Sequence, residues 1–207
     1  MALKLKTYNL SITLTGPLLG SQPGRDTPAA DYLRDKLRKE HPELGEIPDE
    51  ELEKLPEFTE ELKKGTTGFH RNGDGKPMLY NYHIMGMLKA AASSLNGTRN
   101  FKNLRSKIQT TVRVTPRELV IDGELAEQPL ERPLMGMTAQ GPRVSLARSE
   151  MVNEGAKIEC QIVVADTPKF CCDEALLREL LDYGSMFCGL GQWRNSAVYG
   201  QFSYVLS

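Results

Sequence analysis

The order of apolar patterns along the 207 residues is the feature that most restricts the fold. Residues 3–14 and 157–165 alternate apolar and polar side chains, which predicts strands that each bury one face. Residues 82–95 and 173–183 instead repeat apolar side chains every three or four positions, which predicts helices packed along one side. A chain that interleaves these two periods is expected to be an α+β protein.

Two more segments complete the pattern. Residues 110–121 are typical of strand, interrupted at Pro116, and residues 199–206 predict a closing strand. Without insertions the order is βαββαβ, the ferredoxin-like order that RNA-recognition modules also use. We therefore expect four strands in one antiparallel sheet, both helices on one face, and the other face free for a ligand.

Two insertions interrupt this core, which is like that of an RNA-recognition module (RRM-like). Residues 26–64 hold 7 basic and 13 acidic side chains and predict an acidic helical insertion, with helices over about 26–41 and 48–64. Residues 132–152 predict a long β-hairpin. Neither insertion has the length of a separate domain, so we expect a single domain over residues 1–207.

Composition excludes several classes of protein. Hydrophobic residues make up 40% and charged residues 26%, as in ordinary globular proteins. No apolar stretch approaches the ~20 residues that span a bilayer, and the alternating start lacks the apolar block of a signal peptide. The four cysteines (Cys160, Cys171, Cys172 and Cys188) form no C-x-x-C pair. We therefore expect reduced thiols, a cytoplasmic location, and neither a metal, a cofactor nor a membrane partner.

The net charge of −1 hides a basic middle segment. Residues 65–149 hold 12 basic and 6 acidic side chains, and residues 99–117 hold six basic side chains and no acid. Such a segment can neutralise phosphates, which predicts binding of single-stranded RNA or DNA. The alternative is a solvated helix face with no ligand.

A glycine-bearing segment, residues 189–200, lies between the last predicted helix and the last strand. Glycines let a backbone approach a ligand closely, and free backbone N–H groups can hold a phosphate. Trp193 can stack on a base and Arg194 can pair with a phosphate. The alternative is that the glycines cap the helix and the tryptophan anchors the core. The residues expected to bind nucleic acid are Lys89, Arg99, Lys102, Arg105, Arg132, Arg143, Arg148, Gly189, Gly191, Trp193 and Arg194.

Three motifs carry a resemblance to a known family. They are the first loop (TGPLLGSQPGRD, residues 15–26), the Gly-x-Pro strand that enters a Gly-x-Leu-Lys helix (residues 75–89), and the late glycine loop. Together they resemble the RAMP superfamily, the backbone and guide-RNA-processing subunits of CRISPR effector complexes. The resemblance implies an RNA-binding platform with a protruding hairpin at residues 132–152, within a larger ribonucleoprotein. Residues 131–150 and 181–196 also resemble an uncharacterised family carried by prophages of Gram-positive bacteria.

Catalysis is not the favoured function, but candidates for it exist. Some backbone subunits of the resembled family cleave RNA through an aspartate in the loop after the first strand, where Asp26 stands here. His70 or His83 could serve as a general base. An aspartate at a helix start is more often a cap, and the chain has no Walker loop and no nucleophile elbow. The open alternatives to non-catalytic binding are a metal-dependent or histidine-dependent ribonuclease and an assembly protein or homo-oligomer that acts through protein partners.

Overall fold

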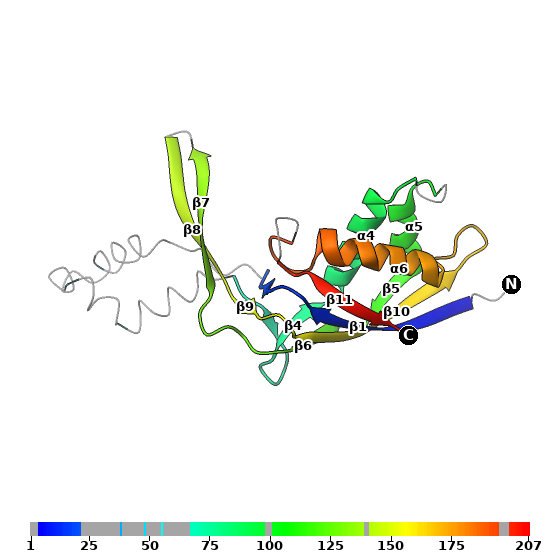
Figure 1. Ribbon diagram of the computed structural model, residues 1–207, viewed down its shortest axis with the longest axis horizontal. Coiled ribbons are helices and arrows are strands. Elements are labelled where there is room, and N and C mark those ends of the chain that lie inside the picture. Colours follow the sequence, from blue (N-terminus) through cyan, green and yellow to red (C-terminus); the bar gives the residue numbers. More distant parts are fainter. Residues whose placement is uncertain are drawn as a thin grey trace. The chain divides into compact units, whose positions relative to one another are not determined.

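A computed structural model describes residues 4–21, 38, 48, 55, 67–97, 101–138, 141–194 and 199–207 (Figure 1). The chain divides into two compact units. Unit 1 comprises Met1–Gly20, Phe69–Ala126 and Val152–Ser207, and unit 2 comprises Ser21–Gly68 and Glu127–Met151. The expected single domain over residues 1–207 stays a prediction.

Unit 1 is built on one antiparallel sheet whose strands follow the order β11-β1-β10-β6-β4-β3, with β5 also paired to β10. The strands are β1 (Lys4–Leu14), β3 (His70–Arg71), β4 (Pro77–Tyr80), β5 (Val112–Thr115), β6 (Glu118–Asp122), β10 (Lys157–Asp166) and β11 (Phe202–Leu206). Two short strands, β2 (Leu18–Leu19) and β9 (Met151–Val152), contribute Leu18 and Val152 to the same core. The α+β class and the antiparallel sheet are confirmed.

Three helices cover one face of this sheet (Figure 1). They are α4 (Tyr82–Ser94), α5 (Leu104–Thr111) and α6 (Glu174–Tyr183). A short π-helix, η3 (Gly184–Cys188), continues α6. The predicted buried face of α6 is confirmed, since its four leucines are at most 1% exposed. Asp173 caps this helix, because its Oδ1 accepts a hydrogen bond from the Leu176 amide at 2.8 Å.

The sheet has more strands than the four expected. The turn after β3 explains one addition: Asn72 Oδ1 accepts from the amides of Asp74 and Lys76, which fixes a hairpin between β3 and β4. β6 follows β5 after a break at Pro116, where proline offers no N–H to a ladder. α5 begins at Leu104, within the basic segment of residues 99–117.

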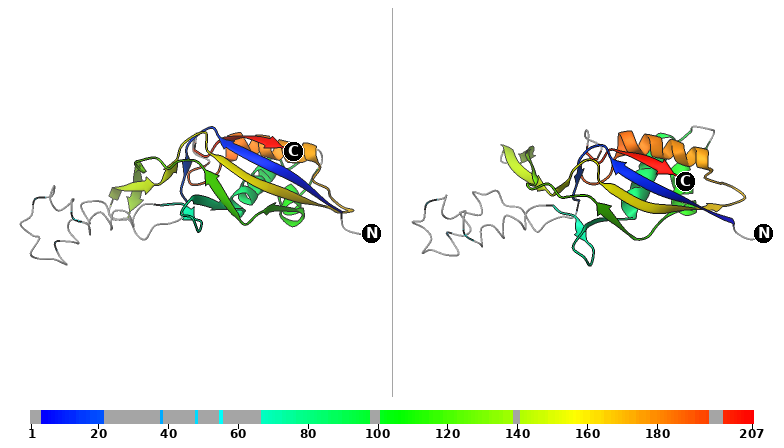
Figure 2. Two further views of the ribbon diagram at one scale, coloured as in Figure 1. Left: turned by 90° about the horizontal axis from the view of Figure 1, so that it is seen from below. Right: turned by 60° about the horizontal axis from the view of Figure 1, so that its bottom comes forward.

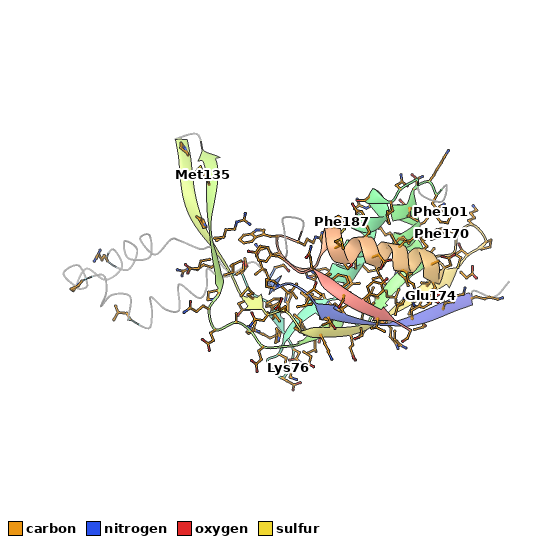
Figure 3. The ribbon with its side chains drawn as sticks, in the orientation of Figure 1. Lys76, Phe101, Met135, Phe170, Glu174 and Phe187 are labelled. Carbon is orange, nitrogen blue, oxygen red and sulfur yellow. The ribbon has the colours of Figure 1, made fainter. Side chains whose placement is uncertain are left out.

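An aromatic pair joins the segment just before α5 to the loop between β10 and α6. The rings of Phe101 and Phe170 meet edge to face with centroids 5.3 Å apart, and they lie side by side in Figure 3. The Lys107 ammonium lies 5.3 Å from both centroids. A cation over two rings stabilises this end of the helical layer.

The described part of unit 2 is mainly a hairpin. Strands β7 (Leu130–Thr138) and β8 (Gly141–Ser149) pair antiparallel along their full length, which confirms the hairpin expected over 132–152. The hydroxyls of Thr67 and Ser149 lie 2.7 Å apart at its base. The helices expected over 26–41 and 48–64 lie outside the described residues.

Candidate nucleic-acid interface

Four rings from one edge of unit 1 form a continuous series, which we call the aromatic row: His70, Tyr80, Tyr82 and His83. Successive ring centroids lie 4.6, 5.6 and 4.6 Å apart, and the last pair is stacked. His70 and Tyr80 come from neighbouring strands, whereas Tyr82 and His83 form the first turn of α4. Tyr82 is 56% exposed, so its ring can accept a further aromatic partner from solvent.

Local structure explains why these rings meet. β4 leads into α4 through Asn81 alone, and the Asn81 side chain donates to the Val114 carbonyl at 2.7 Å instead of capping the helix. The Asn81 amide donates to the Arg117 carbonyl at 2.8 Å. These two bonds tie the strand-to-helix corner to β5 and to the turn before β6, and they hold Tyr80 and Tyr82 on either side of it.

Two arginine side chains lie near different rings of the row. The Arg117 guanidinium carbon lies 5.3 Å from the centroid of the Tyr80 ring. Arg194 reaches the other end from the glycine loop, where its Nη1 would lie 3.5 Å from a Cβ at Gly86. This is an ordinary van der Waals distance, so the Arg194 guanidinium lies beside Gly86 on α4. Exposed rings beside guanidinium groups are the combination that single-stranded nucleic acids require, since bases stack and phosphates pair.

Nearby positive charge affects the pKa of His83. Burial, followed by the charges of Arg194 and His70, lowers the pKa of His83 to about 4. Its imidazole is therefore neutral at pH 7, and it can stack on a ring or accept a hydrogen bond without adding to the local positive charge.

The stability of the protein should depend on pH through His83. We expect the melting temperature to fall as pH drops from 6.5 towards 4, because the unfolded imidazole takes up a proton over this range and the folded one does not. The stabilisation is complete above the unfolded pKa and is lost on acidification. His83→Gln should flatten this dependence. An imidazole titration followed by NMR checks the assignment, and a His83 midpoint near 6.5 in the folded protein would contradict it.

The glycine loop uses its amides inside the protein. The Leu190 amide donates to Gly200 O at 2.9 Å, the Gln192 amide to Leu19 O at 3.2 Å, and the Gly200 amide to Pro17 O at 2.8 Å. Gly189 likewise donates to Gly184 O at 2.8 Å. These four amides are therefore not offered to a phosphate. The loop instead fixes the place of Arg194.

Positive φ angles explain the loop's glycines. Gly189, Gly191 and Gly200 have φ values of 63°, 75° and 67°. A Cβ at Gly191 would lie 2.5 Å from the Leu19 carbonyl oxygen, which leaves room for no other residue. Trp193 is half-buried, with its ring 6.2 Å from the Tyr199 ring in an edge-on arrangement. This favours the structural interpretation of the glycines, and the binding roles of Trp193 and Arg194 stay predictions.

The other expected binding residues are dispersed. Lys89 is half-buried on α4. Lys102 is exposed just before α5, and Arg105 is exposed in the first turn of that helix. Arg99 lies outside the described residues, as does the side chain of Arg143. In unit 2, Arg132 is exposed, and Arg148 Nε lies 2.7 Å from Glu131 Oε1. Among these residues only Arg194 joins the aromatic row.

The two tyrosines of the row, and the position of Arg117 beside Tyr80, were not predicted from the sequence. His70 and His83 were expected only as possible bases. A signal was present, since residues 80–83 read Tyr-Asn-Tyr-His, with three rings in four positions. The aromatic row also does not lie on the open face of the sheet, where a ligand was expected to bind. Along β1 and β10 the side chains on that face are aliphatic, polar or charged and include no ring, and His70 and Tyr80 lie at the β3–β4 edge instead.

All four cysteines are free, and Cys160, Cys172 and Cys188 are buried. Burial raises the pKa of the Cys160 thiol to about 12. Across the described residues no group of three or more His, Cys, Asp or Glu side chains is placed to hold a metal ion. Within the same residues, none of the helices has the length and apolar character needed to cross a membrane.

Comparison with known proteins yields distant structural likenesses. The sequence matches no protein-family model and no curated protein. Among solved structures, it is similar to a chain in the cryo-EM structure of the Type III-B Cmr-β complex bound to cognate target RNA, with a TM-score of 0.48 and 11% identity. The alignment covers 98% of this chain and 61% of that chain, so this chain spans under two thirds of its length. At this TM-score the likeness carries no argument about function.

Proposed function

We propose that this protein binds single-stranded nucleic acid at the aromatic row, without catalysis. The observation that carries the proposal is the row itself, with the exposed Tyr82, the Arg117 guanidinium near Tyr80, and Arg194 close enough for its charge to act on His83. A base stacks on Tyr82, and Arg117 and Arg194 neutralise the phosphates on either side of it. RNA is the favoured ligand because the sequence motifs resemble the RAMP superfamily.

The finer parts of the proposal rest on the same resemblance. We propose a ferredoxin-like core for unit 1 and a phage- or prophage-type RAMP-like protein that works in a larger ribonucleoprotein or as a homo-oligomer. Lys89, Lys102 and Arg105 are proposed as further contacts to the nucleic-acid backbone, and Arg132, Arg143 and Arg148 as contacts from the hairpin. Light scattering with and without RNA tests the assembly.

Fluorescence anisotropy with labelled single-stranded RNA tests the binding site. We expect Tyr82→Ala to weaken binding about 5- to 100-fold, because stacking on one ring contributes about 1–3 kcal/mol per base. Arg117→Ala and Arg194→Ala should each weaken binding and reduce the slope of log affinity against log salt by about 0.7, the value for one lost phosphate contact on a single strand.

Two matched variants serve as controls. Phe187, labelled in Figure 3, is about as exposed as Tyr82, but it lies in η3 and its ring neighbour is Tyr183 and no ring of the row. Arg113 is exposed on β5, and its Nη1 donates to Gln109 O at 2.7 Å. Phe187→Ala and Arg113→Ala should bind like the unsubstituted protein. Equal losses in the control and row variants, or no binding at micromolar protein, would exclude the aromatic row as the site.

A ribonuclease is the second candidate, favoured by the presence of two histidines in one row. His83 is neutral at pH 7 and can accept a proton from a ribose 2′-hydroxyl, and two tyrosine rings separate it from His70. Labelled RNA that stays intact over hours, with and without Mg²⁺, supports the non-catalytic proposal. Cleavage lost in His83→Ala would replace it.

A further inference from the structure

β1 is longer than its neighbour on one side. It pairs with β10 from Lys4 to Thr13 but with β11 only from Leu10 to Leu14. Both views in Figure 2 show β1, in blue, running past the end of the red β11 beside the yellow β10. Within the described ranges, no strand pairs with residues 4–8 on the β11 side. This stretch, residues 4–8 of β1, is the open edge of the sheet.

The backbone groups of the open edge have a defined direction. Asn9 and Ser207 exchange both backbone hydrogen bonds, at 2.7 and 3.0 Å, so Asn9 points its N–H and C=O towards the β11 side. Direction alternates along an antiparallel strand, so Leu5 and Thr7 point their groups the same way. No described residue bonds to them there. Two donors and two acceptors are therefore available to one added strand.

The side chains of the open edge select what can be added. Leu5 is 60% exposed and lies opposite Ala165 on β10, next to Val163, on the face away from the helices. Lys4 and Lys6 are exposed and lie on the other face. A strand paired here would place alternate side chains beside Leu5 and beside the two lysines.

These lysines disfavour a second copy of the chain as the occupant. The two-fold register that uses both Leu5 and Thr7 on each copy sets Lys6 opposite Lys6 of the second copy. Like charges directly opposite one another destabilise a pair of strands. Acidic side chains in the same positions would instead pair with the lysines.

We propose that the open edge binds an extended segment of another protein in which acidic and apolar residues alternate. The segment adds to the sheet as an antiparallel strand in line with β11. Its backbone pairs with Leu5 and Thr7, its acidic side chains face Lys4 and Lys6, and its apolar side chain covers Leu5. This surface is separate from the aromatic row and does not depend on nucleic-acid binding.

An NMR titration with two capped peptides tests the proposal. Gly-Thr-Glu-Val-Glu-Gly carries the required alternation, and Gly-Thr-Lys-Val-Lys-Gly has the same backbone with the charge reversed. We expect the acidic peptide to shift the Leu5 and Thr7 amides and to bind at least about fivefold more tightly than the basic one. Lys4→Glu/Lys6→Glu should invert this preference.

A proline substitution separates strand addition from charge attraction. The Thr7 amide makes no described internal bond, so Thr7→Pro removes no ladder bond of the sheet but deletes one donor of the open edge. We expect Thr7→Pro to abolish binding of the acidic peptide and Thr7→Ala, which keeps the amide, to preserve it.

Three results would overturn the proposal. They are equal affinity for the two peptides, no shift of the open-edge amides by the acidic peptide, and a dimer of the free protein that Thr7→Pro dissociates. The last would assign the open edge to a second copy. Because the peptide assay contains no nucleic acid, its failure leaves the proposed function of the aromatic row unaffected.

Discussion

Gly200→Ala is expected to destabilise unit 1 by more than about 3 kcal/mol. Gly200 has a φ of 67°, and this left-handed conformation costs an alanine about 1–2 kcal/mol. A Cβ there would also collide with the carbonyl oxygen of Leu190. The loop would have to open, which breaks the bonds from Leu190 N to Gly200 O and from Gly200 N to Pro17 O. Each such bond contributes about 1 kcal/mol.

Gly155→Ala is the matched control. Its φ is 87°, and a Cβ at this position would meet nothing within 4 Å. It should therefore cost only the conformational term of about 1–2 kcal/mol. Urea denaturation followed by tryptophan fluorescence reports the loop directly through Trp193. Equal losses for the two variants would contradict the close packing of the loop. Gly200→Ala should also weaken RNA binding, since the loop carries Arg194.

A pair of substitutions between α4 and η3 should show strong coupling. Met87→Ala empties a fully buried position and is expected to cost about 2–5 kcal/mol. Gly184→Ala should cost about 1–3 kcal/mol, because its Cβ would collide with Met87 Sδ in a filled core. In the double variant the new methyl group occupies space that the methionine vacates, so the combined loss should be clearly smaller than the sum.

A double-mutant cycle of unfolding free energies measures this coupling. An interaction energy of at least about 1 kcal/mol is expected for residues in direct contact. Leu176→Ala, on the far end of α6, supplies the comparison and should add to Gly184→Ala without coupling. Additive losses for Met87 and Gly184 would show that the two residues do not share one space.

The helices and the long strands could be predicted because their apolar residues repeat with the period of the structure. Residues 173–183 bury the expected leucines, and β1 and β10 begin and end within one residue of the expected strands. The additional strands could not be predicted so easily. β3 has only two residues and β4 only four, too few for a period to emerge, and their pairing depends on a turn held by the Asn72 side chain.

The candidate site was predicted only in part, because it depends on residues that are distant in sequence. Arg194 was expected as a ligand contact, but its neighbour Gly86 lies over 100 positions earlier, and only the fold brings them together. The loop glycines were expected to offer their amides outwards. Sequence alone does not reveal that the first loop, through Pro17 and Leu19, supplies the acceptors for these amides.

The pairing of β1 has a consequence for the order in which the protein forms during synthesis. Among the described strands, β1 pairs in the sheet with β10 and β11 alone, which begin at Lys157 and Phe202. At roughly 5–20 residues per second, a ribosome makes β1 about 10–30 s before it makes β10. Over that interval the apolar side of β1, with Leu10, Ile12 and Leu14, has no sheet to join. The nascent chain should therefore be a substrate for chaperones that bind extended apolar segments until its last quarter emerges.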